Sequence, residues 1–328
     1  MQNNLTKKDI EKLNKWAKKY DIKKLQTKYK NKLLDIKELM LGELSRAEKN
    51  FSYIPNEIFK LVNLKELYIK SINLKALPKD IGNLINLEEL TIGSNCKLKK
   101  LPKEIGKLTN LKKLEIRCEK LNELPKELFN LTNLKEFEIR SENLVKLPKE
   151  ICNFSKLENI EIACENLKEL PHEIGNLKKL KYFTLWESNL KKFPKEFGNL
   201  INLEYFKIYS SYSLKEFPKE IANFTKLIHL TIECYKMKEL PREIGNLINL
   251  KSLYIKSANL KELPKEIKNL VNLERIDIIW DGYAKELPNE ILNFEKLKFI
   301  EIKKLGFIYK SVGREYKIEK AKKKIKKG

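Results

Sequence analysis

The chain has 328 residues, of which 42% are apolar and 34% charged, and its formal net charge is +23. This composition supports a packed core, argues against general disorder, and contains no apolar run long enough for a membrane-spanning helix. The charge is concentrated at the ends, since the first 50 residues hold 14 basic and 7 acidic side chains and the last 28 hold 11 and 3. The mildly basic body does not favour nucleic-acid binding.

Residues 1–50 are predicted to form a helical N-terminal cap with a degenerate first strand. A helix is expected to begin at Thr6, because Ile10, Leu13 and Trp16 follow at helical spacing. Trp16 is expected in the core of this cap, and a second helix is expected over residues 22–34. The segment 36–41 is read as the degenerate first strand, which would give twelve strands in all.

The eleven prolines of the chain share one period of 23 or 24 residues. They are Pro55, Pro78, Pro102, Pro125, Pro148, Pro171, Pro194, Pro218, Pro241, Pro264 and Pro288. A fixed period in this range indicates a stack of repeats over residues 51–307. Each repeat has one apolar face, which it can bury only against its neighbours.

One repeat reads LPKEIGKLTNLKKLEIRCEKLNE over residues 101–123. Leu114 and Ile116 alternate with charged residues, which predicts a half-buried strand. An acidic residue stands two places after every proline, which favours a short helical turn beginning there. A large apolar residue six places after proline, such as Leu84 or Phe154, should point into the core.

These repeats resemble the leucine-rich repeat family, on the L-x-x-L-x-L signature of Leu87, Leu90 and Ile92 and its recurrence as far as Leu297, Ile300 and Ile302. The pattern is similar to the 23-residue, Ras-suppressor-like type found in small bacterial leucine-rich repeat proteins. The resemblance implies an α/β solenoid, or horseshoe, with a parallel sheet on its concave side and short helical turns on its convex side. It also implies a non-enzymatic protein that binds a partner on the concave face.

The chain departs from the family in the column where asparagine is expected, because only Asn95 fits. The preceding column holds serine or cysteine: Ser71, Ser94, Cys118, Ser141, Cys164, Ser210, Cys234 and Ser257. We expect an inward-facing Ser/Cys ladder in which the cysteines are buried small residues. The odd total of five cysteines, with no CxxC pair, predicts reduced thiols in a reducing compartment.

The C-terminal segment 308–328 is predicted to be a basic cap or tail. In a purely structural role, this segment would be a solvated helix that keeps the end of the sheet polar. The alternative is electrostatic attraction to nucleic acid or an anionic membrane through the basic ends.

The sequence offers little for catalysis. There are two histidines, and no phosphate-binding loop or hydrolase motif occurs. His172 is interpreted as a surface substitution, and no catalytic residue, metal or cofactor is expected.

The strand residues expected on the concave face change character along the chain. Repeats three to five carry charges of both signs, whereas repeats six to nine carry rings. The candidate partner-binding residues are Tyr182, Trp186, Tyr205, Tyr209, His229 and Tyr254. Tyr and Trp are enriched among binding hot spots, so one exposed patch with Trp186 is predicted to bind a protein or peptide. The competing interpretation is that the rings only pack on one another, since aromatic residues favour strands.

The expected protein is a monomeric bacterial scaffold, since its Lys-, Asn- and Ile-rich composition suggests an AT-rich bacterial genome. It is expected in the cytoplasm, because the N-terminus contains no apolar signal segment. Two alternatives stay open: an electrostatic binder of nucleic acid or anionic membrane, and a host-directed effector exported without such a signal.

Overall fold

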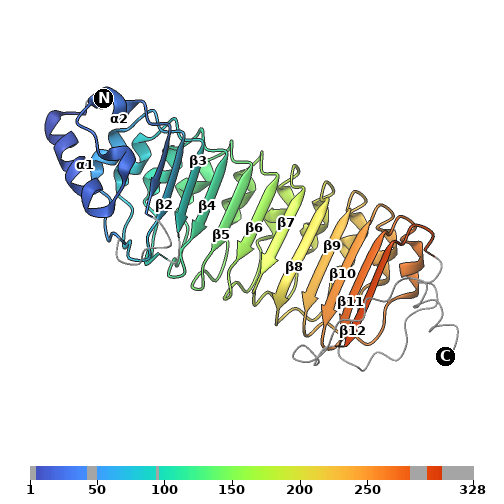
Figure 1. The fold of residues 1–328 in the computed structure, drawn as a ribbon. Helices are drawn as coiled ribbons and strands as arrows, with labels where there is room; N and C mark the ends of the chain where they lie inside the picture. The colour runs from blue at the N-terminus through green and yellow to red at the C-terminus, as the bar shows by residue number, and fades with distance from the viewer. Residues whose placement is uncertain (1–4, 43–49, 94–95, 281–293, 305–328) are drawn as a thin grey trace. The chain divides into compact units, whose positions relative to one another are not determined.

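Figure 1 shows a computed structural model of the chain, which describes residues 5–42, 50–93, 96–280 and 294–304. The predicted tail over residues 308–328 lies outside this range. The chain forms two compact units, residues 1–158 with 162–164, and residues 159–161 with 165–328.

The first unit begins with helix α1, Lys7–Tyr20. Its predicted start is confirmed, since Thr6 and Asp9 form a reciprocal capping box. Trp16 is 4% exposed and packs on Phe51 with ring centroids 5.2 Å apart. Lys60 donates to Asp9 over 2.9 Å. Burial opposes ionisation of Asp9, but the hydrogen bonds from Lys60 and Thr6 lower its pKa to about 2.

The prediction of one helix over residues 22–34 was wrong. A 3₁₀ turn, η1 (Lys23–Leu25), and a short helix, α2 (Lys30–Leu34), flank a non-helical link. Side chains hold that link open, because Asn14 donates to the Thr27 carbonyl over 2.5 Å and Gln26 donates to the Ala17 carbonyl over 3.2 Å. These local bonds compete with the helical ones that a single helix would need.

Twelve parallel strands follow in the part of the chain that the structure describes, and their order in the sheet is the chain order. They are β1 (Glu38–Leu41), β2 (Glu66–Lys70), β3 (Glu89–Gly93), β4 (Lys113–Arg117), β5 (Glu136–Arg140), β6 (Asn159–Ala163), β7 (Tyr182–Trp186), β8 (Tyr205–Ser211), β9 (His229–Cys234), β10 (Ser252–Ser257), β11 (Arg275–Trp280) and β12 (Phe299–Lys304). In the first unit β1 to β5 pair in register, and in the second unit β7 to β12 do so, with one shift in β8.

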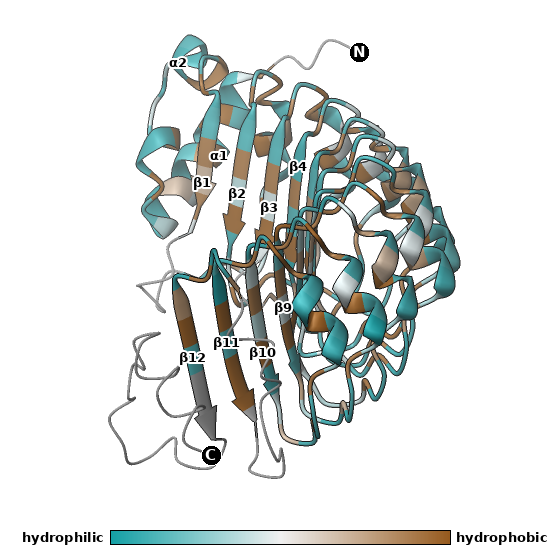
Figure 2. Ribbon diagram, turned by 90° about the vertical axis from the view of Figure 1, so that its right-hand side faces the viewer, coloured by the Kyte–Doolittle hydropathy of each residue, from teal (hydrophilic) through white to brown (hydrophobic). Residues whose placement is uncertain are grey.

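Side chains of each strand alternate between the core and the opposite side, which we call the open face. In β4 the apolar pair Leu114 and Ile116 is fully buried, while Glu115 is half-buried on the open face. The alternating brown and teal bands along β2 in Figure 2 follow this pattern. The predicted period-two strands are therefore confirmed.

Short 3₁₀ turns lie between successive strands. They are η3 (Asn56–Lys60), η4 (Lys79–Asn83), η5 (Lys103–Lys107), η6 (Lys126–Asn130), η7 (Lys149–Asn153), η8 (His172–Asn176), η9 (Lys195–Asn199), η10 (Lys219–Asn223), η11 (Arg242–Asn246) and η12 (Lys265–Asn269). The prolines stand immediately before these turns, in an extended conformation, rather than inside the first turn as predicted. Their carbonyls still accept the first turn bond, as Pro102 does from Ile105. The predicted inward residues Leu84 and Phe154 are fully buried.

The Ser/Cys column faces inward as predicted. Its described members are buried: Ser71, Cys118, Ser141, Cys164, Ser211, Cys234 and Ser257. Ser141 Oγ donates to the Leu121 carbonyl of the preceding repeat over 2.7 Å and accepts from the Asn143 amide at 3.1 Å. Ser257 bonds Met237 and Asn259 in the same way. Ser141 and Ser257 thus do the backbone bonding that asparagine does in the family pattern.

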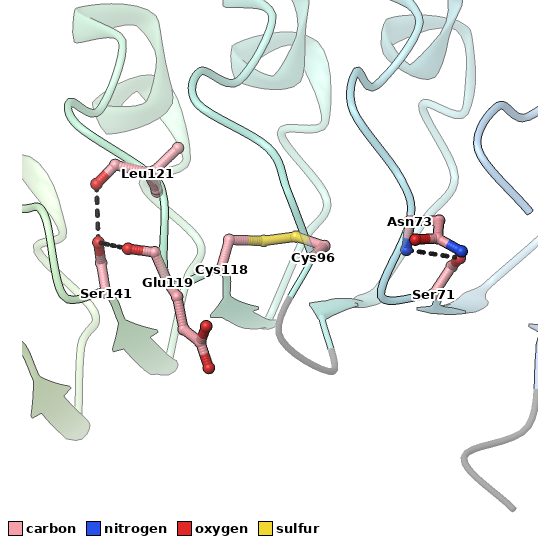
Figure 3. The surroundings of a disulfide bond; sticks show 7 residues. All are labelled: Ser71, Asn73, Cys96, Cys118, Glu119, Leu121 and Ser141. Carbon is pink, nitrogen blue, oxygen red and sulfur yellow. Dashed lines mark hydrogen bonds between the residues drawn. A yellow bond between two sulfur atoms is a disulfide. The ribbon is translucent and has the colours of Figure 1, made fainter. Parts of the chain in front are cut away.

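Two details of that column differ from the prediction. A register shift between Ile208 and Ser211 places Ser211, rather than Ser210, opposite Cys234. In addition, Cys118 forms a disulfide with Cys96, with Cα atoms 4.9 Å apart, so these two thiols are not reduced (Figure 3). Stacking of adjacent repeats brings together residues 22 apart in the chain, a proximity that local cysteine spacing does not reveal. Cys152, Cys164 and Cys234 are free.

A second ladder, which we did not predict, joins the loops before the strands. Asparagines donate Nδ2 to a carbonyl of the preceding repeat, as Asn133 does to Thr109 over 2.8 Å and Asn249 does to Thr225 over 2.7 Å. Where lysine replaces asparagine, as at Lys226, it donates instead to the asparagine of the repeat before, Asn202, over 2.7 Å. These bonds satisfy loop carbonyls and fix the stacking distance of neighbouring repeats.

Candidate functional site

The six candidate residues all lie on the open face of the second unit, on β7 to β10. Strand alternation puts them there, because β7 follows an exposed–buried–half-buried pattern and β9 and β10 alternate half-buried with buried residues. Tyr182 is 39% exposed, while the other five candidates are half-buried. We call this surface the aromatic face: Tyr182, Trp186, Tyr205, Tyr209, His229 and Tyr254.

Three of these rings form one stack across the strands. Tyr182, Tyr205 and His229 occupy the same register position on β7, β8 and β9. The two pairs of adjacent ring centroids are each 4.6 Å apart, with interplanar angles of 15° and 14°. That spacing is the distance between neighbouring strands, so the parallel register itself imposes face-to-face stacking.

Trp186 and Tyr209 form a second stack, with centroids 4.0 Å apart and planes at 17°. Trp186 is half-buried rather than exposed as predicted, because Tyr209 covers one face of its indole. Its Nε1–H is buried and has no hydrogen-bond acceptor among the residues that the structure describes. Burial raises the pKa of the Tyr209 phenol. The β8 register shift lies between Ile208 and Ser211 and so includes Tyr209.

Tyr254 belongs to neither of the two ring stacks. Its register neighbours are Thr231 and Asp277, and both are non-aromatic. Burial, followed by the nearby Glu233 carboxylate, raises the pKa of the Tyr254 phenol. Beyond the strands, Tyr212 and Tyr235 form a further stacked pair with centroids 5.0 Å apart.

The row between the two stacks was not recognised as part of the site. It consists of Thr184, Lys207 and Thr231, which are register neighbours on β7, β8 and β9. The Lys207 ammonium lies 5.8 Å from the centroid of the Tyr205 ring. The sequence did contain a signal for Lys207: it is the charged residue between two tyrosines in the segment Tyr205–Tyr209.

The open face of the first unit is different in character. Arg117 donates to Glu138 through two bonds of 2.6 and 2.8 Å, and Lys113 pairs with Glu115 at 3.0 Å. Tyr68 donates to Glu66 over 2.9 Å. Arg117 and Glu138 thus pair between neighbouring strands, whereas Lys113 pairs with Glu115 within β4. The open face of this unit carries charges of both signs, as the sequence predicted for a solvated sheet.

Within the described ranges no group of three or more His, Cys, Asp or Glu residues could hold a metal ion. His172 is exposed, and its Nε2 lies 3.2 Å from Glu173. His229 belongs to the first ring stack; burial and the charges of Lys207 and Lys251 lower its pKa. Within the same ranges no helix meets the length and hydropathy of a membrane span.

Parallel strands, 3₁₀ turns and stacked ladders together define a repeat solenoid protein. A family model described as a leucine-rich repeat region matches residues 12–145 and 137–243. The chain belongs to the leucine-rich repeat family. Proteins of this family are typically non-enzymatic binding modules and generally act as scaffolds for protein–protein interaction.

Solved structures share the fold. A leucine-rich repeat protein of Leptospira interrogans is 28% identical over 83% of this chain and 85% of that one, with a TM-score of 0.55. The Listeria monocytogenes internalin InlF is 18% identical over 90% and 88%, with a TM-score of 0.58. The functional domain of InlJ from the same organism, which includes a cysteine ladder, is 14% identical over 83% and 65%, with a TM-score of 0.56. A search of curated proteins found no match.

Proposed function

We propose that the protein is a non-enzymatic interaction module that binds a protein partner on the aromatic face of its second unit. The observation that carries the proposal is the concentration of rings on the open face of β7 to β9, in two stacks, while the described open face of the first unit carries paired charges. Rings selected only for strand propensity would be spread over all the repeats.

The stacks change how a partner would make contact. Ring faces within a stack are already covered, so a partner meets ring edges, phenol hydroxyls and the outer face of Tyr182. The contact area offered by each ring is therefore smaller than the ~150–250 Å² of a fully buried aromatic side chain. The stacks also hold the rings in fixed orientations before binding, which lowers the entropic cost of association.

The disulfide bears on where the protein works. The cytoplasmic expectation rested partly on reduced cysteines, and Cys96 and Cys118 are not reduced. Disulfides persist mainly in oxidising environments. This observation favours an oxidising compartment outside the cytoplasm and supports the alternative of an exported protein. The assignment to the 23-residue, Ras-suppressor-like type stays a prediction.

Affinity capture from the native cell extract tests the binding role. The wild type, the variant Trp186→Ala/Tyr209→Ala and the matched control Tyr212→Ala/Tyr235→Ala would be compared at low and high salt. The proposal predicts a protein that is retained by the wild type and the control at high salt, and lost with the first variant. A protein that is lost at high salt, and that the wild type and Trp186→Ala/Tyr209→Ala retain equally at low salt, would instead support electrostatic binding through the basic ends.

A further inference from the structure

Lys207 stands between the two ring stacks of the aromatic face. On β8 it lies two residues from Tyr205 and two from Tyr209, and its register neighbours are the uncharged Thr184 and Thr231. It is half-buried. A cation is therefore placed among rings and hydroxyls, with no charged neighbour in its own row on β7 or β9.

No carboxylate pairs with Lys207 in the part of the chain that the structure describes. Its ammonium lies 5.8 Å from the centroid of the Tyr205 ring. On β10 and β11, by contrast, the open-face cations have carboxylate partners: Lys256 has Glu233 at 3.5 Å, and Arg275 has Asp277 at 2.6 Å. Lys207 thus retains donors and a charge that are available to an incoming anion.

The carboxylates bordering the aromatic face are already engaged. Glu233 pairs with Lys256 and also interacts with Tyr254. Glu161 on β6, which acts electrostatically on Tyr209, makes contacts of its own. The cationic field of Lys207 and Lys251 also reaches the neighbouring ring of His229, where it adds to burial in lowering the pKa.

We propose that the aromatic face binds an extended acidic peptide segment of a protein partner, with an Asp or Glu carboxylate on the Lys207 ammonium and apolar side chains against the two ring stacks. This inference rests on the proposed function. Charge complementarity favours this partner. Lys207 is a half-buried cation without a carboxylate partner and lies between two ring stacks, so the complementary ligand has one carboxylate between two apolar groups.

The spacing along β8 sets the pattern of the peptide. Tyr205, Lys207 and Tyr209 are two residues apart, so their side chains are ~7 Å apart along the strand. An extended peptide running along the strand has the same two-residue repeat on one side. The expected motif is therefore apolar–x–acidic–x–apolar, which reads the same in either chain direction.

The basic end of this chain is a poor candidate for the same surface. Residues 314–328 contain eight basic and two acidic side chains. Lys207 and Lys251 would repel such a segment, whereas they attract an acidic one.

Selection from a library of random twelve-residue peptides on the immobilised full chain tests the inference. The proteins are the wild type, Lys207→Gln, Lys207→Glu, Trp186→Ala/Tyr209→Ala and the control Lys70→Glu. Lys70 is a half-buried cation on the open face of β2 in the first unit and is not part of the aromatic face. Circular dichroism would establish that each variant is folded.

We expect the wild type and Lys70→Glu to enrich acidic residues flanked by apolar ones, and Lys207→Glu to enrich Lys or Arg at the same position. The best acidic peptide should bind Lys207→Gln roughly tenfold more weakly, which is the usual loss for a charge-assisted hydrogen bond. Peptides that need Trp186 and Tyr209 but show no acidic preference would overturn the role of Lys207 and leave the proposed function standing. Acidic enrichment that persists on Lys207→Glu would also overturn it. Failure to enrich any peptide would count against both proposals.

Discussion

Trp186 and Tyr209 pack against each other and also belong to the surface that we propose binds the partner. Their rings lie 4.0 Å apart, so each one stabilises the other whether or not a partner is present. A double-mutant cycle of Trp186→Ala and Tyr209→Ala should give a coupling of ~0.5–1.5 kcal/mol in the free energy of unfolding, measured with urea. The cycle of Trp186→Ala with Tyr53→Ala, an exposed tyrosine of the first unit, should give none. Equal couplings in the two cycles would contradict the stacked arrangement.

The buried cysteines should be chemically inert in the folded protein. Burial raises the pKa of the Cys164 and Cys234 thiols to about 12, and the thiolate is the reactive form. Below that pH both groups stay protonated, so alkylation of the native, unreduced protein at pH 8 should label Cys152 alone. Mass spectrometry after denaturation without reduction should then count three labelled thiols. Rapid native labelling of Cys164 or Cys234 would show that the inward column is open to solvent.

Among the elements, the 3₁₀ turns set how closely the repeats of a unit approach each other. A Cβ added to Gly175 in η8 would lie 2.1 Å from the Glu196 carbonyl oxygen of the next repeat. Alanine normally stabilises a position of ordinary backbone conformation, but here the clash must displace backbone atoms. Gly175→Ala should therefore lower the free energy of unfolding by about 1–3 kcal/mol.

Ala222 provides the matched control, because it occupies the equivalent place in η10 and already carries a Cβ. Ala222→Gly should lower stability by only about 0.5–1 kcal/mol, through the flexibility of glycine. Urea unfolding of both variants measures the difference. A Gly175→Ala protein as stable as the wild type would mean that the turns are free to separate.

For the molecule as a whole, the disulfide ties neighbouring repeats of the first unit. It closes a loop of 22 residues between Cys96 and Cys118, for which the chain-entropy model gives about 3 kcal/mol. The variant Cys96→Ala/Cys118→Ser should lose about that much stability under oxidising conditions, since serine already fills the same column at Ser141. Cys164→Ser, in the same column without a disulfide, should lose less. Equal losses would contradict a role for the bond.

The repeat itself could be predicted because its signals are local. Proline spacing and strand alternation placed the strands and turns, and both depend on a few adjacent residues. The features that were missed depend on neighbouring repeats. The disulfide joins Cys96 to Cys118 of the next repeat, and Tyr209 on β8 covers Trp186 on β7. The register shift that places Ser211 in the Ser/Cys column arises from the pairing of β8 with β9. The importance of Lys207 likewise emerges only when its neighbours in both directions are known.

Site-specific photo-crosslinking would show whether the partner binds at the aromatic face. A benzophenone side chain would replace Tyr182 on the aromatic face or, as a control, the exposed Ile201 in the loop before β8. Each variant would be mixed with the partner protein captured from the extract, and the complex would be irradiated. We expect a covalent adduct from position 182 and none from position 201. An adduct from position 201 alone would place the partner away from the aromatic face and contradict the account.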